Sequence, residues 1–175
     1  MRAYHLTPGA GLAGLALREQ SVPDPAPTEA LVRVRATALN YRELLVARDT
    51  YALPLKRDLI PVSDGAGEVV AVGAEVTRVQ PGDRVMAAIF PRWLDGPFDL
   101  EVSAQLGGSL DGMLTEYAAL DQDALVCIPE HLSYEQAATL PCAAVTAWHA
   151  LSGGRGVHPG ETVLTLGSGG VSLFA

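Results

Sequence analysis

The segment that most constrains the fold is the run Asp64-Gly65-Ala66-Gly67-Glu68-Val69-Val70-Ala71-Val72-Gly73. Its valines favour a β-strand, and its inner glycines mark a kink or a close approach of another backbone. The turn sequence Pro81-Gly82-Asp83-Arg84-Val85 follows it. Together the two segments predict a glycine-kinked strand over 65–73 that continues through a turn into a second strand over 84–89.

Further β patterns lie on both sides of this unit. Residues 30–38 alternate between arginine and apolar positions, as a half-buried strand does. The glycine-rich turn Gly9-Ala10-Gly11 lies between two apolar segments that could pair as a hairpin. We therefore expect strands at 2–6, 12–18, 30–38, 113–120 and 124–128, with a long loop over 90–112.

Helices are predicted from capping patterns. Asn40 with Glu43, and Ser133 with Gln136, each have the spacing of a capping box, in which two side chains satisfy free backbone N–H groups. A third segment carries Val145, Trp148 and other apolar residues at helical spacing. The predicted helices span 41–48, 134–138 and 142–151.

The end of the chain has the pattern of a dinucleotide-binding unit. An apolar segment over 161–166 is followed at once by Gly167-Ser168-Gly169-Gly170-Val171. A buried strand, a tight glycine turn and a helix N-terminus allow the backbone to approach a pyrophosphate. A complete βαβ unit takes roughly 30 residues, so we expect only its beginning before Ala175.

Composition excludes several classes of function. The 175 residues are 49% hydrophobic and 18% charged, which is typical of a globular protein, and the net charge is −8. No Lys or Arg occurs from Trp93 to Gly154, where nine acids lie. Such a surface repels nucleic acid and anionic lipid, so we predict neither as a partner. Only Cys127 and Cys142 could form a disulfide, and the N-terminus lacks a signal-peptide pattern, which predicts a cytoplasmic protein.

The glycine-kinked strand, the pair Thr146-Ala147 and the glycine turn at 167–170 occur in an order that resembles the medium-chain dehydrogenase/reductase superfamily over the whole chain. The resemblance implies a mainly β fold with short helices. A GroES-like β-barrel, the catalytic domain, is expected over residues 1–132. Connecting helices and the truncated first strand and glycine turn of an NAD(P)-binding Rossmann domain are expected over 133–175.

Zinc members of that superfamily take catalytic ligands from a Cys, a His and a Cys. The matching positions here are Asn40, Ser63 and Cys142, whereas catalytic zinc usually has three protein ligands. The loop at 90–112 contains no Cys for a structural zinc. We therefore predict no metal and a resemblance to the zinc-independent branch, which includes quinone oxidoreductases and enoyl reductases.

That branch commonly shows the pattern matched by Asn40-Tyr41-Arg42-Glu43, with a later Tyr matched by Tyr51. The resemblance implies catalytic roles for Tyr51, as a proton or hydrogen-bond donor, and for Asn40, which would orient the nicotinamide or the substrate carbonyl. The residues predicted to bind the cofactor are Asn40, Thr146, Gly167, Ser168, Gly169, Gly170 and Val171.

Each of these residues also has a structural interpretation that the sequence leaves open. Asn40 could be only a helix cap, Tyr51 an aromatic residue in a loop, and Thr146 an ordinary helix residue. His149 fits a helix histidine better than a catalytic base, and Cys142 fits a small buried hydrophobe.

Two functions remain in competition. The first is a zinc-independent NAD(P)H-dependent oxidoreductase that acts on an apolar enone, quinone or carbonyl compound, with NADP favoured over NAD by analogy and a homodimer in a full-length protein. In that case the present chain alone is expected to be inactive. The alternative is a non-catalytic GroES-like fragment or interaction module that binds no cofactor.

Overall fold

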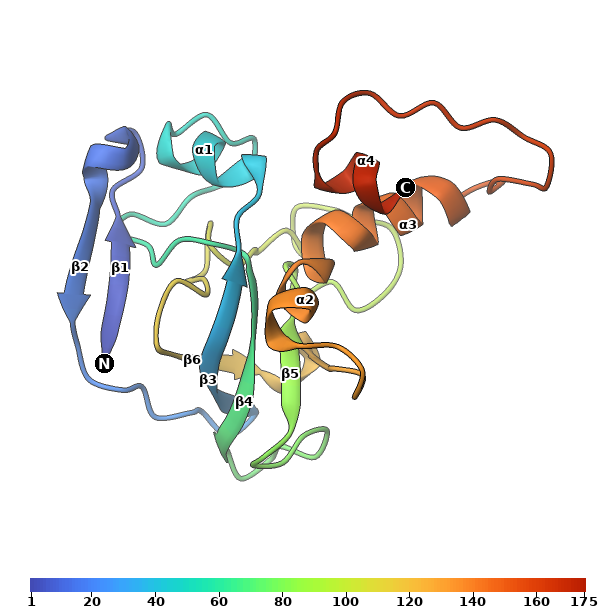
Figure 1. Cartoon of the computed structure of the whole chain (residues 1–175). Helices are drawn as coiled ribbons and strands as arrows, with labels where there is room; N and C mark the ends of the chain where they lie inside the picture. The colour runs from blue at the N-terminus through green and yellow to red at the C-terminus, as the bar shows by residue number, and fades with distance from the viewer.

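The computed structural model describes residues 1–175 as a two-stranded hairpin beside a five-stranded antiparallel sheet, with short helices at one end (Figure 1). The hairpin pairs β1 (Arg2–Leu6) with β2 (Leu15–Glu19). The larger sheet has the order β6-β3-β4-β5-β7. Its strands are β3 (Glu29–Ala38), β4 (Asp64–Val72), β5 (Arg84–Ala87), β6 (Tyr117–Asp121) and β7 (Leu125–Cys127).

The helices are short, and most of them follow the sheet in the chain. They are α1 (Tyr41–Ala47), α2 (Tyr134–Ala138), α3 (Val145–Ser152) and α4 (Gly170–Phe174), with 3₁₀ turns η1 (Gly11–Gly14) and η2 (Gln122–Ala124) and a π-helical turn η3 (Leu140–Ala144). Figure 1 shows α2 lying across the sheet near β4 and β5, with α3 and α4 beyond it. None of the helices is long and apolar enough to cross a membrane.

The kinked strand predicted from the glycines is β4, at the centre of the sheet. It pairs with β3 through a register that shifts twice, between Leu31 and Val32 and between Val34 and Ala36. A Cβ at Gly67 would collide with the backbone carbonyl of Arg33. The glycine is therefore required here because the neighbouring strand approaches too closely for a side chain.

The main core lies against this sheet. It contains eleven buried residues, which are Ala30, Val32, Val69, Val79, Val85, Ala87, Leu106, Met113, Ala118, Leu120 and Leu125. Leu106 and Met113 come from outside the strands, so the segment before β6 closes one side of the core. This arrangement is a GroES-like fold, as the sequence predicted.

Most predicted elements are confirmed, with shifted ends. The expected hairpin forms, although residues 11–14 are a 3₁₀ turn and not the start of the strand. The capping box of Ser133 with Gln136 is present. The strand expected over 113–120 begins only at Tyr117, because residues 114–116 bond to β1: Leu114 accepts from the N–H of Tyr4, and Glu116 donates to Arg2.

The strand predicted over 161–166 is wrong for this chain. These residues have no sheet partner and are exposed, with Leu164 84% and Leu166 85% exposed. A strand requires a neighbour to accept its backbone hydrogen bonds, and apolar pattern alone cannot supply one. In Figure 1 this segment arches away from the sheet before α4 returns to α3.

Candidate functional site

The candidate site lies where β3 ends, β4 begins and η3 passes above them. Ala38, near the end of β3, is directly opposite Asp64, the first residue of β4. Asn40 therefore emerges beside Asp64 as the chain turns into α1. The π-helical turn brings Cys142 to the same place, since its backbone N–H donates to Asp64.

The carboxylate of Asp64 accepts three hydrogen bonds. Nδ2 of Asn40 donates to Oδ2 over 2.9 Å, the N–H of Cys142 donates to the same oxygen over 3.3 Å, and Oγ of Ser63 donates to Oδ1 over 3.0 Å. Asp64 is fully buried and takes part in none of the ion pairs. Burial raises the pKa of Asp64, and the hydrogen bonds from Asn40 and Ser63 oppose the shift.

A second carboxylate lies next to the first. Oε1 of Glu43 accepts from the N–H of Ser63 at 3.0 Å and from Nη1 of Arg42 at 3.1 Å. Arg42 also donates to the carbonyl oxygens of Leu106 and Gly107, at 3.3 and 3.5 Å. Arg42 thereby joins α1 to the segment that closes the core.

The capping box predicted for Asn40 with Glu43 is therefore wrong. Asn40 has the backbone conformation of an N-cap, but its side chain makes no capping bond. The two side chains instead donate to Asp64 and accept from Ser63, respectively. Asp64 and Ser63, at the start of β4, bond to these side chains in place of the backbone N–H groups of the helix end. Sequence spacing cannot predict which of the two sets of partners is chosen.

The chain is strained immediately before these groups. Val62 has φ +75°, and it precedes the buried Ser63. A β-branched residue in the left-handed region is rare and costs on the order of 1–3 kcal/mol. Tertiary contacts hold it there: the carbonyl of Val62 accepts from the N–H of Met113 at 2.7 Å. Strain of this kind is typical of functional segments.

Tyr51, the predicted proton donor, lies on the other side of α1. It packs against the buried cluster of Leu6, Val46, Ala47 and Leu59, and its ring lies 4.8 Å from the guanidinium of Arg42. It does not line the pocket that Asn40 lines. Tyr51 is connected to Asn40 indirectly, through Arg42, Glu43 and the residues that bond to them.

Asn40 and the glycine turn share a pocket of about 330 Å³. Its lining residues are Ala38, Leu39, Asn40, Thr139, Ala143, Gly170, Leu173 and Phe174. A Cβ at Gly170 would lie 3.1 Å from Cβ of Ala143, so the glycine allows α4 to approach η3 closely. Among the predicted cofactor residues, only Asn40 and Gly170 line this pocket.

The other predicted cofactor residues lie outside that pocket. Gly167, with φ +82°, turns the chain ahead of α4, and Ser168, Gly169 and Val171 are exposed. Thr146 is also exposed, and its Oγ1 donates to the carbonyl of Cys142 at 2.7 Å. Its hydroxyl is therefore tied to its own helix.

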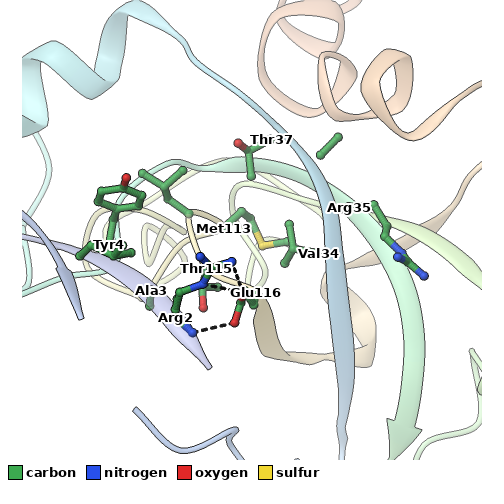
Figure 2. Close-up of a pocket in the computed structure, with 12 residues that line it drawn as sticks. Arg2, Ala3, Tyr4, Val34, Arg35, Thr37, Met113, Thr115 and Glu116 are labelled. Carbon is green, nitrogen blue, oxygen red and sulfur yellow. Dashed lines mark hydrogen bonds and ion pairs between the residues drawn. The ribbon is translucent and has the colours of Figure 1, made fainter. Parts of the chain in front are cut away.

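Two further pockets lie away from Asp64. One, of about 270 Å³, is lined mainly by apolar residues, which are Met86, Ala87, Ala88, Ile89, Phe90, Trp93, Val126, Leu140, Pro141 and Val145. The rings of Phe90, Trp93 and Phe98 meet edge to face beside it. The other, of about 360 Å³, separates β1 from β3, where Arg2 pairs with Glu116 at 2.8 Å (Figure 2).

The structure brings Asn40, Ser63 and Cys142 together at Asp64, and these are the residues that the sequence resemblance matched to zinc ligands. Burial raises the pKa of the Cys142 thiol to about 11 in the metal-free chain. Nδ2 of Asn40 and Oγ of Ser63 already donate to Asp64.

The central place of Asp64 was not expected from the sequence, in which Asp64 was only the first residue of the glycine-kinked run and Glu43 a capping partner and part of the branch pattern. The available signal was the presence of an acid directly before a buried strand, since a carboxylate there must find several donors.

Comparison with known proteins agrees with this fold. The family model of the alcohol dehydrogenase GroES-like domain matches residues 26–130. A zinc-type alcohol dehydrogenase-like protein of Schizosaccharomyces pombe is 46% identical, across 94% of this chain and 49% of its own length. A chloroplast envelope quinone oxidoreductase homolog of Arabidopsis thaliana is 33% identical, across 95% of this chain and 48% of its own.

Among solved structures, a putative alcohol dehydrogenase from Sinorhizobium meliloti superposes with a TM-score of 0.75 at 39% identity, across 86% of this chain and 46% of its own. The fold and the family match define a GroES-like domain of the alcohol dehydrogenase type. The chain belongs to the medium-chain dehydrogenase/reductase superfamily of oxidoreductases. It spans about half the length of the curated relatives that it matches.

Proposed function

We propose that this chain supplies the substrate-side domain of a zinc-independent, NAD(P)H-dependent oxidoreductase that reduces an apolar enone, quinone or carbonyl compound. The observation that carries the proposal is the closed network around Asp64. Asn40, Ser63 and Cys142, which the sequence resemblance matched to the metal ligands of zinc members, all donate hydrogen bonds to Asp64.

The argument against zinc rests on chemistry of the donors. A zinc ion at this place would require the Asn40 amide and the Ser63 hydroxyl to give up their hydrogen bonds to Asp64, and it would find only one thiol, that of Cys142, at the three matched positions. Neither the amide nitrogen nor the neutral hydroxyl is a good zinc ligand. The zinc-type name of the Schizosaccharomyces pombe relative describes that protein, and residue types at the three positions favour a different chemistry here.

The residues that would hold a nicotinamide cofactor are Asn40 and Thr146 on one side and the turn Gly167–Val171 on the other. The shared pocket between Asn40 and Gly170 supports this placement. A bound reduced nicotinamide supplies the hydride for the reaction. The chain's own contribution is orientation by Asn40 and an apolar wall formed by Leu173 and Phe174. NADPH is proposed over NADH by analogy with the zinc-independent branch.

The substrate proposal comes from the apolar pocket beside η3. Leu140, Pro141 and Val145 form its side nearest Cys142, and Phe90 and Trp93 form another wall. A volume of about 270 Å³ with apolar walls suits a small ring or a short acyl chain. Tyr51 remains the proposed proton donor, although it lines neither this pocket nor that of Asn40.

Two measurements test the proposal. Elemental analysis of the purified protein is expected to give well under one zinc per chain; near-stoichiometric zinc would overturn the zinc-independent assignment. NADPH is then titrated calorimetrically into this chain and into the chain extended by any sequence encoded after Ala175. We expect binding by the extended form. Binding by neither form favours the non-catalytic interaction module, for which the exposed segment 161–166 supplies an apolar surface.

A further inference from the structure

The orientation of the Asn40 side chain is set by Asp64. An ionised carboxylate only accepts hydrogen bonds, so it must face the NH₂ group of the Asn40 amide and not the amide oxygen. The other two donors to Asp64, Oγ of Ser63 and the N–H of Cys142, also require an acceptor there. With the amide reversed, Oδ1 of Asn40 would face the carboxylate of Asp64, and two acceptors cannot form a hydrogen bond.

The consequence concerns the opposite end of the amide. Oδ1 of Asn40 makes no hydrogen bond within the chain, and it is not among the buried polar atoms that lack a partner. It is therefore open to solvent. Asn40 lines the pocket that it shares with Gly170, Leu173 and Phe174. An unpaired amide oxygen is thus available at that pocket, and it can only accept.

We infer that Asp64 is a positioning residue that presents Oδ1 of Asn40 to the pocket as an acceptor, for an uncharged N–H or O–H donor of the ligand. The inference rests on the proposed function for the identity of that ligand. Two donors fit the chemistry: the carboxamide NH₂ of a nicotinamide and a hydroxyl of the substrate or product. The inference also assigns one N–H of Asn40 to Asp64, so that hydrogen is not available to a substrate carbonyl.

Asn40 is the only asparagine in the chain, which allows a direct test on the apo protein. Selective ¹⁵N-asparagine labelling gives a single side-chain NH₂ pair in an NMR spectrum. We expect two well-separated protons, one of them shifted downfield and protected from solvent exchange. In Asp64→Ser the pair should collapse toward solvent values, whereas the control Glu68→Gln, which breaks only a partly exposed ion pair with Arg35, should leave it unchanged.

The wild-type spectrum keeps the inference falsifiable even where Asp64→Ser fails to fold. A pair in the wild type with coincident shifts and fast exchange would show that Asp64 does not hold the amide. A pair that stays protected in folded Asp64→Ser would overturn the inference as well. Neither result depends on whether the protein binds a nicotinamide, so failure of the positioning role and failure of the proposed function are separable.

The ligand arm uses the form of the protein that binds NADPH. Binding of NADPH is compared with that of the reduced 3-acetylpyridine analogue, in which a methyl ketone replaces the carboxamide and its NH₂ donor. If the carboxamide is the donor, wild type should favour NADPH on the order of tenfold, and Asp64→Ser should lose this preference. If wild type binds both dinucleotides equally, and the NMR signals of the Asn40 NH₂ pair shift only when a hydroxylated substrate is added, the donor to Oδ1 is the substrate hydroxyl. No response of the pair to either ligand overturns the acceptor role.

Discussion

Replacing Arg42 by Met should destabilise the protein strongly, because Arg42 is the cation of a buried ion pair. The Arg42 and Glu43 side chains are only 7% and 12% exposed, and they pair at 3.1 Å. Arg42→Met leaves the Glu43 carboxylate buried without its cation, and it leaves the carbonyl oxygens of Leu106 and Gly107 without a donor. Removing one partner of a buried ion pair costs about 3–5 kcal/mol, a large part of the stability of a typical domain.

The free energy of unfolding would be measured by urea denaturation of wild type, Arg42→Met, Glu43→Gln and the double variant. Because each single change leaves one buried charge unpaired, the double variant should be more stable than the sum of the two losses predicts, by at least about 1 kcal/mol. The matched control is Arg35→Met, whose partner Glu68 is partly exposed and which should cost at most about 1 kcal/mol. A loss below about 1 kcal/mol for Arg42→Met, with additive single changes, would refute the buried-pair reasoning.

Three further outcomes follow from the fold and the site. Gly67→Ala should destabilise by several kcal/mol in the same urea assay, because its Cβ would collide with the carbonyl of Arg33; wild-type stability would contradict the close strand approach. Burial raises the folded pKa of Asp64 above its ordinary 3.8, so its contribution to the unfolding free energy should fall as the pH rises from that value through the folded pKa. Asp64→Asn should remove this downward slope, which a pH series of unfolding curves would detect. Iodoacetamide at pH 8 should modify the exposed Cys127 and leave Cys142 nearly unreacted, because the pKa of Cys142 is about 11; mass spectrometry showing equal rates would count against a buried thiol.

Local patterns predicted the elements whose partners lie nearby in the chain. The hairpin of β1 with β2 follows from apolar segments around a glycine turn, and the helix after Ser133 follows from a capping box that needs only Gln136. The kink of β4 was also predictable, since a strand with two inner glycines has few other uses. In these cases the interacting groups are close in sequence, so propensity and spacing contain the physical cause.

Two segments that depend on distant partners could not be predicted from sequence. Residues 161–166 have the composition of a strand, but the backbone groups of a strand need a neighbour, and none is present along them. Residues 114–116 leave the strand pattern because β1 bonds to them across more than 100 positions of the chain. Tertiary contacts determine the conformation of such segments, because their backbone N–H and C=O groups bond to whichever partners the folded chain places beside them.

The sequence by itself determined the GroES-like fold class, the family, and the residue types at the three positions that the resemblance matches to zinc ligands. Only the tertiary structure decided what those residues do. Asn40 and Glu43 have the spacing of a helix cap, yet folding brings Asp64 and Ser63 within reach of both side chains. A buried carboxylate is costly unless several donors meet it, and these donors come from the end of β3, the start of β4 and η3. Such a convergence exists only once the three segments are packed together, which is why the network around Asp64 had to be seen in the structure.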